Sequence, residues 1–182
     1  MYTEEIKRTW NEDADRDKQV EHCILGIKSE VGEYLSALKK VVGYGKELDI
    51  TNVIEELGDL YYFTCTLDRV LNVNLGIVEP VNKLGSKTTQ ALQVMAGDIY
   101  NAADGFNAYF KGHEDECFYN YYLHTVFTHI NDLCTAHSLN PDEVREANIR
   151  KLKARFPEKF EVSNAENRNL DAERDAITNQ KG

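Results

Sequence analysis

Proline is scarce in this chain, which contains three prolines in 182 residues. Proline interrupts a helix because it lacks a backbone N–H and its ring clashes with the preceding turn. Few breaks are therefore forced on long helices. Together with an ordinary apolar content of 42%, this scarcity favours an all-α fold, a bundle of long helices.

Long apolar runs and an export signal are also missing. No run approaches the roughly 18 to 20 apolar residues that a membrane span needs, and the N-terminus, MYTEEIKRTWNED, is charged throughout. The four cysteines form neither C-x-x-C pairs nor zinc-binding spacings, which predicts reduced core residues in a cytoplasmic protein without a membrane partner. They are Cys23, Cys65, Cys117 and Cys134.

Positive charge is in deficit, with 21 basic residues against 31 acidic ones and a formal net charge of −10. Such a balance repels the backbone of nucleic acids, so we expect no nucleic-acid partner. An anionic ligand would need cations between itself and the protein. The chain also lacks the phosphate loop, the dinucleotide-binding glycine motif and the nucleophile elbow.

Apolar residues recur three or four positions apart over four long stretches, which is the period of a helix that buries one face. The predicted helices run from Glu21 to Val42, from about Asn52 to Leu67, from Thr88 to Phe110 and from Glu116 to His137. Asn52 and Glu55 have capping-box spacing, which predicts that Asn52 begins the second helix.

The clearest helix signal is LNPDEVREANIRKLKARFP. Asn140 is the predicted cap, Pro141 takes the first helical position and Pro157 enforces the stop. A short helix interrupted by Pro80 is predicted before Thr88. We expect residues 1–160 to form a single domain, followed over 161–182 by an arm or frayed tail with too few large apolar residues to pack by itself.

Within this domain, residues 20–86 and 88–156 form a faint internal repeat. The segment EVGEYLSALKKVVGYGKE aligns with DIYNAADGFNAYFKGHED, and both halves predict a helix, a glycine-containing turn, a helix and a short helix. The second half has lost most of the acids of the first. A degenerate duplication is one interpretation, and chance similarity between helices is the other.

Two acidic pairs lie on consecutive predicted helices. Glu30 and Glu33 are three residues apart, as are Glu56 and Asp59, so the members of each pair leave the same face of their helix. A single E-x-x-E is most often a solvated face. Two such pairs at the edges of the apolar stripes of a helical hairpin instead predict four converging carboxylates, which need a cation such as Mg²⁺, or Mn²⁺ as a substitute. A di-iron bundle is the alternative, but it usually requires Glu-x-x-His pairs.

A glycine precedes the second acid of each pair, and an interior glycine costs a helix about 1 kcal/mol relative to alanine. We expect the missing side chains of Gly32 and Gly58 to let the two helices approach closely and bring the acid pairs together.

These motifs resemble the MazG-like, all-α nucleoside triphosphate pyrophosphatase family. The resemblance rests on two segments, GIKSEVGEYLSALKKVVGYGKELD…VIEELGDLYYF, with its E-x-x-E and E-x-x-D, and SLNPDEVREANIRKLKARFPEKF. The simplest members pass almost directly from the E-x-x-D helix to the N-x-x-K-L-x-x-R helix, whereas this chain inserts a helical pair between residues 71 and 137.

The resemblance implies a metal-dependent hydrolysis of a nucleoside triphosphate to the monophosphate and pyrophosphate, by a homodimer or higher homo-oligomer. It places magnesium on Glu30, Glu33, Glu56 and Asp59. The four acids further lead to the hypothesis that Glu33 and Glu56 have catalytic roles, with Glu33 orienting the attacking water. The resemblance also implies that the nucleotide or its phosphates contact Lys40, Asn148, Lys151 and Arg155.

Two alternatives stay open at this point. The chain could be a non-catalytic helical scaffold that binds nucleotide or metal, or the enzyme could be selective for one base, as for dUTP or (d)GTP.

Overall fold

A computed structural model describes residues 2–75, 88–110 and 116–178, and within them all regular secondary structure is helical, which confirms the all-α prediction. The helices are α1 (Tyr2–Arg8), α2 (Arg16–Tyr44), α3 (Ile50–Leu71), α4 (Thr89–Phe110), α5 (Glu116–Ala136), α6 (Pro141–Arg155), α7 (Val162–Glu166) and α8 (Leu170–Thr178). The predicted short helix around Pro80 lies outside the described residues. No helix in the described part of the chain combines the length and apolarity needed to cross a membrane.

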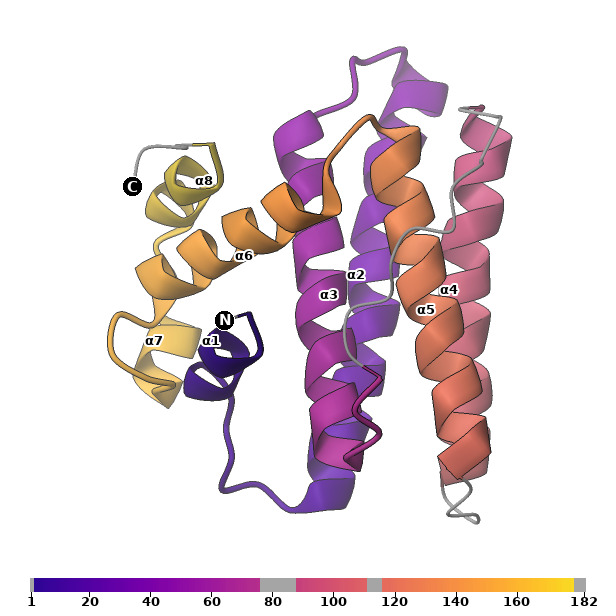
Figure 1. The fold of residues 1–182 in the computed structure, drawn as a ribbon. Helices are drawn as coiled ribbons and strands as arrows, with labels where there is room; N and C mark the ends of the chain where they lie inside the picture. Colours follow the sequence, from indigo (N-terminus) through magenta and orange to yellow (C-terminus); the bar gives the residue numbers. More distant parts are fainter. Residues whose placement is uncertain (1, 76–87, 111–115, 179–182) are drawn as a thin grey trace.

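The four longest helices stand side by side as a bundle (Figure 1). Helix α2 packs against α3 and α4, and α5 packs against α3 and α4, so the four enclose a common core. Helix α6 crosses the bundle at an angle and leads to a smaller group made of α1, α7 and α8 on one side (Figure 1). A cleft is lined by residues of α2, α3, the end of α6 and the α1–α2 connection.

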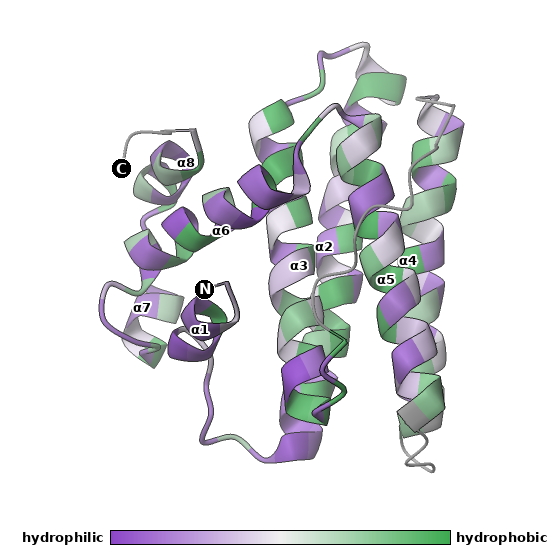
Figure 2. Ribbon diagram, viewed as in Figure 1, coloured by the Kyte–Doolittle hydropathy of each residue, from purple (hydrophilic) through white to green (hydrophobic). Residues whose placement is uncertain are grey.

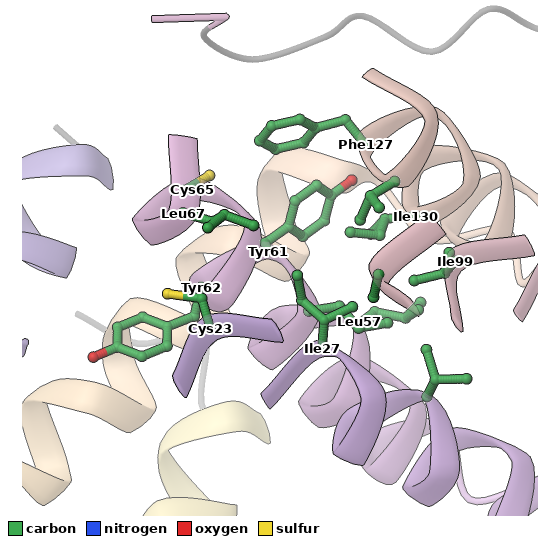
Figure 3. Packing of buried hydrophobic residues seen from close by; sticks show 14 of the residues in the cluster. Cys23, Ile27, Leu57, Tyr61, Tyr62, Cys65, Leu67, Ile99, Phe127 and Ile130 are labelled. Atoms are coloured by element: carbon green, nitrogen blue, oxygen red, sulfur yellow. The ribbon is translucent and has the colours of Figure 1, made fainter. Parts of the chain in front are cut away.

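The bundle core is apolar, with green stripes along the long helices in Figure 2. Tyr61 of α3 is 1% exposed and points towards Phe127 and Ile130 of α5 (Figure 3). Burying each such side chain stabilises the fold by about 1.5–3 kcal/mol, because apolar surface leaves water. The prediction of core cysteines holds for Cys23, Cys65 and Cys134 and is wrong for Cys117, which is exposed.

Capping side chains fix the N-termini of α3 and α6. The side chain of Asp49 accepts a hydrogen bond from the backbone N–H of Asn52 at 3.1 Å, so α3 begins at Ile50 and the predicted cap at Asn52 is wrong. Asp49 lies three residues earlier and accepts from an N–H group of the first turn, which has no partner within the helix. The predicted cap of α6 is confirmed, since Asn140 accepts from the N–H of Asp142 at 2.8 Å and Pro141 follows it.

The glycines serve other contacts than those predicted. A Cβ at Gly32 would meet nothing within 4 Å, so its proposed role in helix approach is wrong. A Cβ at Gly58 would lie 2.9 Å from Cβ of Asn148, so this glycine admits α6 rather than α2. The close approach between α2 and α3 occurs at Gly26, where a Cβ would lie 2.5 Å from the ring of Phe63.

The segment after Phe160, predicted as an arm or frayed tail, forms α7 and α8, and α8 packs against α6. Ile177 is 4% exposed, and Arg150 of α6 donates hydrogen bonds to the carbonyl groups of Ala176 and Ile177 at 2.9 and 3.2 Å. These bonds satisfy carbonyl groups at the end of α8 that have no partner within the helix. The C-terminal segment is thereby fixed beside the cleft.

The predicted half-repeats each contain a helical hairpin, α2–α3 in the first and α4–α5 in the second. This shared layout is common among helical proteins, so the duplication stays a prediction.

Candidate functional site

Three carboxylates from two helices converge at the cleft. Glu30 and Glu33 of α2 and Glu56 of α3 each offer an oxygen, and these atoms lie within 4.8 Å of one another. Glu56 is buried, Glu30 is half-buried and Glu33 is exposed. The side-chain amide of Asn52, one turn earlier on α3, donates to Glu56 Oε1 at 2.8 Å and orients it. The cluster therefore reaches from the protein interior to solvent.

Burial and mutual repulsion disfavour ionisation of the two inner carboxyls. Burial, followed by the nearby carboxylates of Asp59 and Glu56, raises the pKa of Glu30. Burial also raises the pKa of Glu56, together with the carboxylates of Glu33, Asp59 and Glu55, while an interaction with Glu30 works in the opposite direction. A hard divalent cation would relieve this repulsion, and an all-oxygen set of carboxylates suits Mg²⁺ or Mn²⁺.

The fourth predicted ligand, Asp59, is engaged by α6. Its Oδ1 accepts a hydrogen bond from Nδ2 of Asn148 at 2.8 Å, and its Oδ2 forms an ion pair with Nζ of Lys151. Lys151 is fully buried and also lies 3.5 Å from a carboxylate oxygen of Glu55. Tyr2 of α1 donates to Asn148 Oδ1 at 3.0 Å. Asp59 therefore lies next to the cluster but is held by a buried polar network.

The predicted phosphate-binding residues divide into three groups. Asn148 and Lys151 are buried and contact Asp59, so the structure brings them to the acids rather than to open solvent. Arg155 lines the cleft beside the carboxylates. Lys40 is exposed near the far end of α2 and does not line the cleft.

The cluster opens into the cleft, which has a volume of about 380 Å³. One end of the cleft is acidic, with Glu30, Glu33, Glu55, Glu56 and Asp59. The other end is aromatic, because the rings of Trp10 and His22 lie 4.8 Å apart and Phe63 and Tyr62 complete the wall.

Hydrogen bonds fix this aromatic wall. The indole N–H of Trp10 donates to Gln19 Oε1 at 2.7 Å, and the Tyr62 hydroxyl donates to the carbonyl group of Thr9 at 3.0 Å. Trp10 is only 6% exposed, since the rings of His22, Tyr62 and Phe63 pack around it. The wall is preformed, so a planar ligand would not need to order it.

The two ends of the cleft are separated along α2. His22 and Glu30 are eight residues apart, which corresponds to about 12 Å at the helical rise. A ligand that contacts both ends would combine a flat ring system with an anionic group carried on cations. The size and polarity of the cleft suit such an elongated molecule.

Several cleft residues have no signal in the sequence motifs. Trp10, Phe63 and Arg168 reach the cleft from the α1–α2 loop, from α3 and from the C-terminal segment. Helix α8 carries Glu173 and Ile177 four residues apart on one buried face, and this spacing is the signal that could have predicted its docking.

Neither a scan of protein-family models nor searches of curated proteins and of solved structures find a match to this chain. The function of the protein is therefore inferred from the chemistry of the cleft.

Proposed function

We propose that this protein is a metal-dependent nucleoside triphosphate pyrophosphohydrolase, a MazG-like enzyme that converts a nucleoside triphosphate to the monophosphate and pyrophosphate. One observation carries the proposal: a single cleft combines three carboxylates within 4.8 Å of one another with a preformed aromatic wall. The carboxylates suit the cations that accompany a triphosphate, and the aromatic rings suit a nucleobase.

The three clustered glutamates would hold the cation. Mg²⁺, or Mn²⁺ in its place, supplies Lewis-acid chemistry when bound, because it neutralises charge on phosphate oxygens and makes water more acidic. Glu33 is the exposed member of the cluster and is accessible to a water molecule from solvent. In the proposed reaction Glu33 accepts a proton from the water that attacks the α-phosphorus, the bond from this phosphorus to the bridging oxygen breaks, and pyrophosphate leaves.

The other residues position the substrate. The base would contact His22, which is exposed, and Phe63, which is half-buried, with the buried ring of Trp10 behind them. Arg155 would bind phosphate oxygens through its guanidinium group. Asn148 and Lys151 would act through Asp59, whose carboxylate they orient. Asp59 would thus support the cluster from one turn along α3.

The test measures pyrophosphate release from the eight common ribo- and deoxyribonucleoside triphosphates and from dUTP, with Mg²⁺ and with EDTA. We expect release only with the metal, and the ranking of bases would identify any selectivity, for dUTP or (d)GTP among others. A folded protein that binds a nucleotide without turnover would instead be a non-catalytic scaffold.

A Glu56→Gln variant tests whether Glu56 takes part in the proposed hydrolysis. We expect kcat to fall about 100-fold or more, because metal-ion stabilisation of the transition state is worth several kcal/mol. Glutamine is neutral and nearly isosteric, so the fold should survive, and circular dichroism checks this. Glu47→Gln is the control, since Glu47 is exposed in the α2–α3 loop and outside the cleft. Undiminished turnover in the Glu56 variant would contradict the assignment.

A further inference from the structure

Two arginines of the cleft share one buried carboxylate. Glu173 of α8 is 1% exposed. Arg155 of α6 donates to its two oxygens from Nε at 3.1 Å and from Nη2 at 2.5 Å. Arg168, in the α7–α8 connection, donates in the same way at 3.3 and 2.7 Å. Each guanidinium is therefore held in a two-point, planar contact that fixes its orientation.

This arrangement keeps a positive charge at the cleft. Two guanidinium groups face one carboxylate, so the trio of Arg155, Arg168 and Glu173 has a net charge of +1. Burial favours the neutral acid, yet the hydrogen bonds from the two arginines lower the pKa of Glu173, so it stays ionised at neutral pH. The two arginines both line the cleft, whereas Glu173 does not.

Each arginine has donors that its contact with Glu173 does not use. The bonds to Glu173 use Nε and Nη2 of each guanidinium, and within the described residues Nη1 of Arg155 and of Arg168 has no hydrogen-bond partner. The side chain of Arg168 is 38% exposed. Its Nη2 lies 3.9 Å from Glu55, at the acidic end of the cleft. An anion at this position would contact the arginines and, through cations, the carboxylate cluster.

We infer that Arg168 and Arg155, positioned by Glu173, form a subsite for the phosphate chain of the substrate, so that the C-terminal segment is part of the active site. The inference rests on the proposed function for the identity of the substrate. Its own basis is the pair of oriented, positively charged guanidinium groups at the cleft, whose Nη1 donors are not used by Glu173 and suit phosphate oxygens. Glu173 is a positioning residue, since its carboxylate accepts hydrogen bonds from the two arginines and does not line the cleft.

Inorganic tripolyphosphate with Mg²⁺ is the probe, and isothermal titration calorimetry is the measurement. Arg168→Gln should weaken binding about tenfold or more, because a charge-assisted hydrogen bond is lost together with a positive charge. Arg174→Gln is the matched control, since Arg174 lies on α8 with a half-exposed side chain and pairs with Asp49 outside the cleft. It should bind as the unaltered protein does.

Glu173→Gln tests the positioning role. Glutamine keeps the shape but offers one acceptor oxygen, so one arginine loses its orientation while both keep their charge. We expect weaker tripolyphosphate binding, a raised KM for the nucleotide and a smaller change in kcat, with thermal unfolding recorded to show that the chain is folded. A folded Glu173→Gln variant with unchanged tripolyphosphate binding and unchanged KM would show that Glu173 does not position the two arginines.

The outcomes separate this inference from the proposed function. If the unaltered protein fails to bind tripolyphosphate, or if Arg168→Gln binds as tightly as Arg174→Gln does, the subsite is overturned even where turnover persists. If Arg168→Gln weakens binding but no nucleoside triphosphate is hydrolysed, the subsite stands and the hydrolase assignment fails.

Discussion

The protonation of Glu30 and Glu56 should affect the stability of the whole protein. Their pKa values are raised by burial and by neighbouring carboxylates, so the folded state holds these protons more strongly than the unfolded chain does. The free energy of unfolding of the metal-free protein should therefore decrease as the pH rises above about 4.3, the pKa of a glutamate in an unfolded chain. The decrease should continue until both carboxyls have lost their protons.

A divalent cation should reverse this loss, because it binds the ionised carboxylates and releases their protons. We predict that Mg²⁺ raises Tm little at pH 5 and more at pH 8. At 100 times Kd the stabilisation is about 2.7 kcal/mol, or about 5–10 °C for a chain of this size. Differential scanning fluorimetry across this pH range, with EDTA as the reference, measures both effects.

Glu30→Gln provides the control for the same experiment. A neutral amide at this position should make the metal-free protein more stable at pH 8 than the unaltered chain, and should reduce the shift caused by Mg²⁺. If the variant responds to Mg²⁺ as the unaltered chain does, Glu30 is not a ligand.

At the scale of the helix, the glycines of α2 have different surroundings. A Cβ at Gly26 would lie 2.5 Å from the ring of Phe63, whereas one at Gly32 would meet open space. We predict that Gly26→Ala lowers the free energy of unfolding by about 1–3 kcal/mol, because the α2–α3 contact becomes overpacked. Gly32→Ala should raise it by up to about 1 kcal/mol, because alanine favours the helix.

Urea unfolding followed by circular dichroism measures both changes. The pair is matched, since both substitutions add the same methyl group to the same helix. Gly32→Ala should also leave Mg²⁺ binding intact. Equal effects at the two positions would show that helix propensity, rather than the contact with Phe63, decides the outcome.

The glycines also show what the sequence could predict. Apolar spacing predicts the four bundle helices, because a buried face leaves a period in the sequence. The N-terminus of α6 is predicted by its capping residues, Asn140 and Pro141. The apolar spacing also places the acid pairs on facing helices. Gly58 faces Asn148 of α6, and Gly26 faces the ring of Phe63. These tertiary contacts produce no periodic pattern in the sequence, so the partner of each glycine could not be predicted. Helices α1 and α8 give only a weak signal, because each is short and buries two residues four positions apart.

For the molecule as a whole, α6 joins the bundle to the smaller group of helices. It packs against α3 on one side and against α8 on the other, and it contributes Asn148, Lys151 and Arg155 to the region of the cleft. Arg8 of α1 donates to the carbonyl groups of Phe156 and Glu158, at 2.6 and 2.8 Å, just after α6 ends. The site is therefore assembled from both ends of the chain.

Lys151, which is buried, and Asp59, which is half-buried, form an ion pair between α6 and α3. Loss of one partner of a buried ion pair typically costs about 3–5 kcal/mol, because the remaining charge has lost its counter-charge. We predict a destabilisation of this size for Lys151→Met, measured by urea unfolding. Lys153→Gln is the control on the same helix, since Lys153 is 54% exposed and pairs with Glu5 at the surface, and it should change stability by no more than about 0.5 kcal/mol.

A double variant separates the pair from the packing around it. Replacing both partners, as Lys151→Met with Asp59→Asn, removes both charges and leaves an oxygen that accepts the hydrogen bond from Asn148. This variant should recover much of the lost stability, because no unpaired charge remains. Recovery would assign the cost to an unpaired charge at the α3–α6 contact. If the double variant is as unstable as Lys151→Met alone, the lysine stem contributes through packing, and the link between the bundle and the smaller group of helices is apolar rather than ionic.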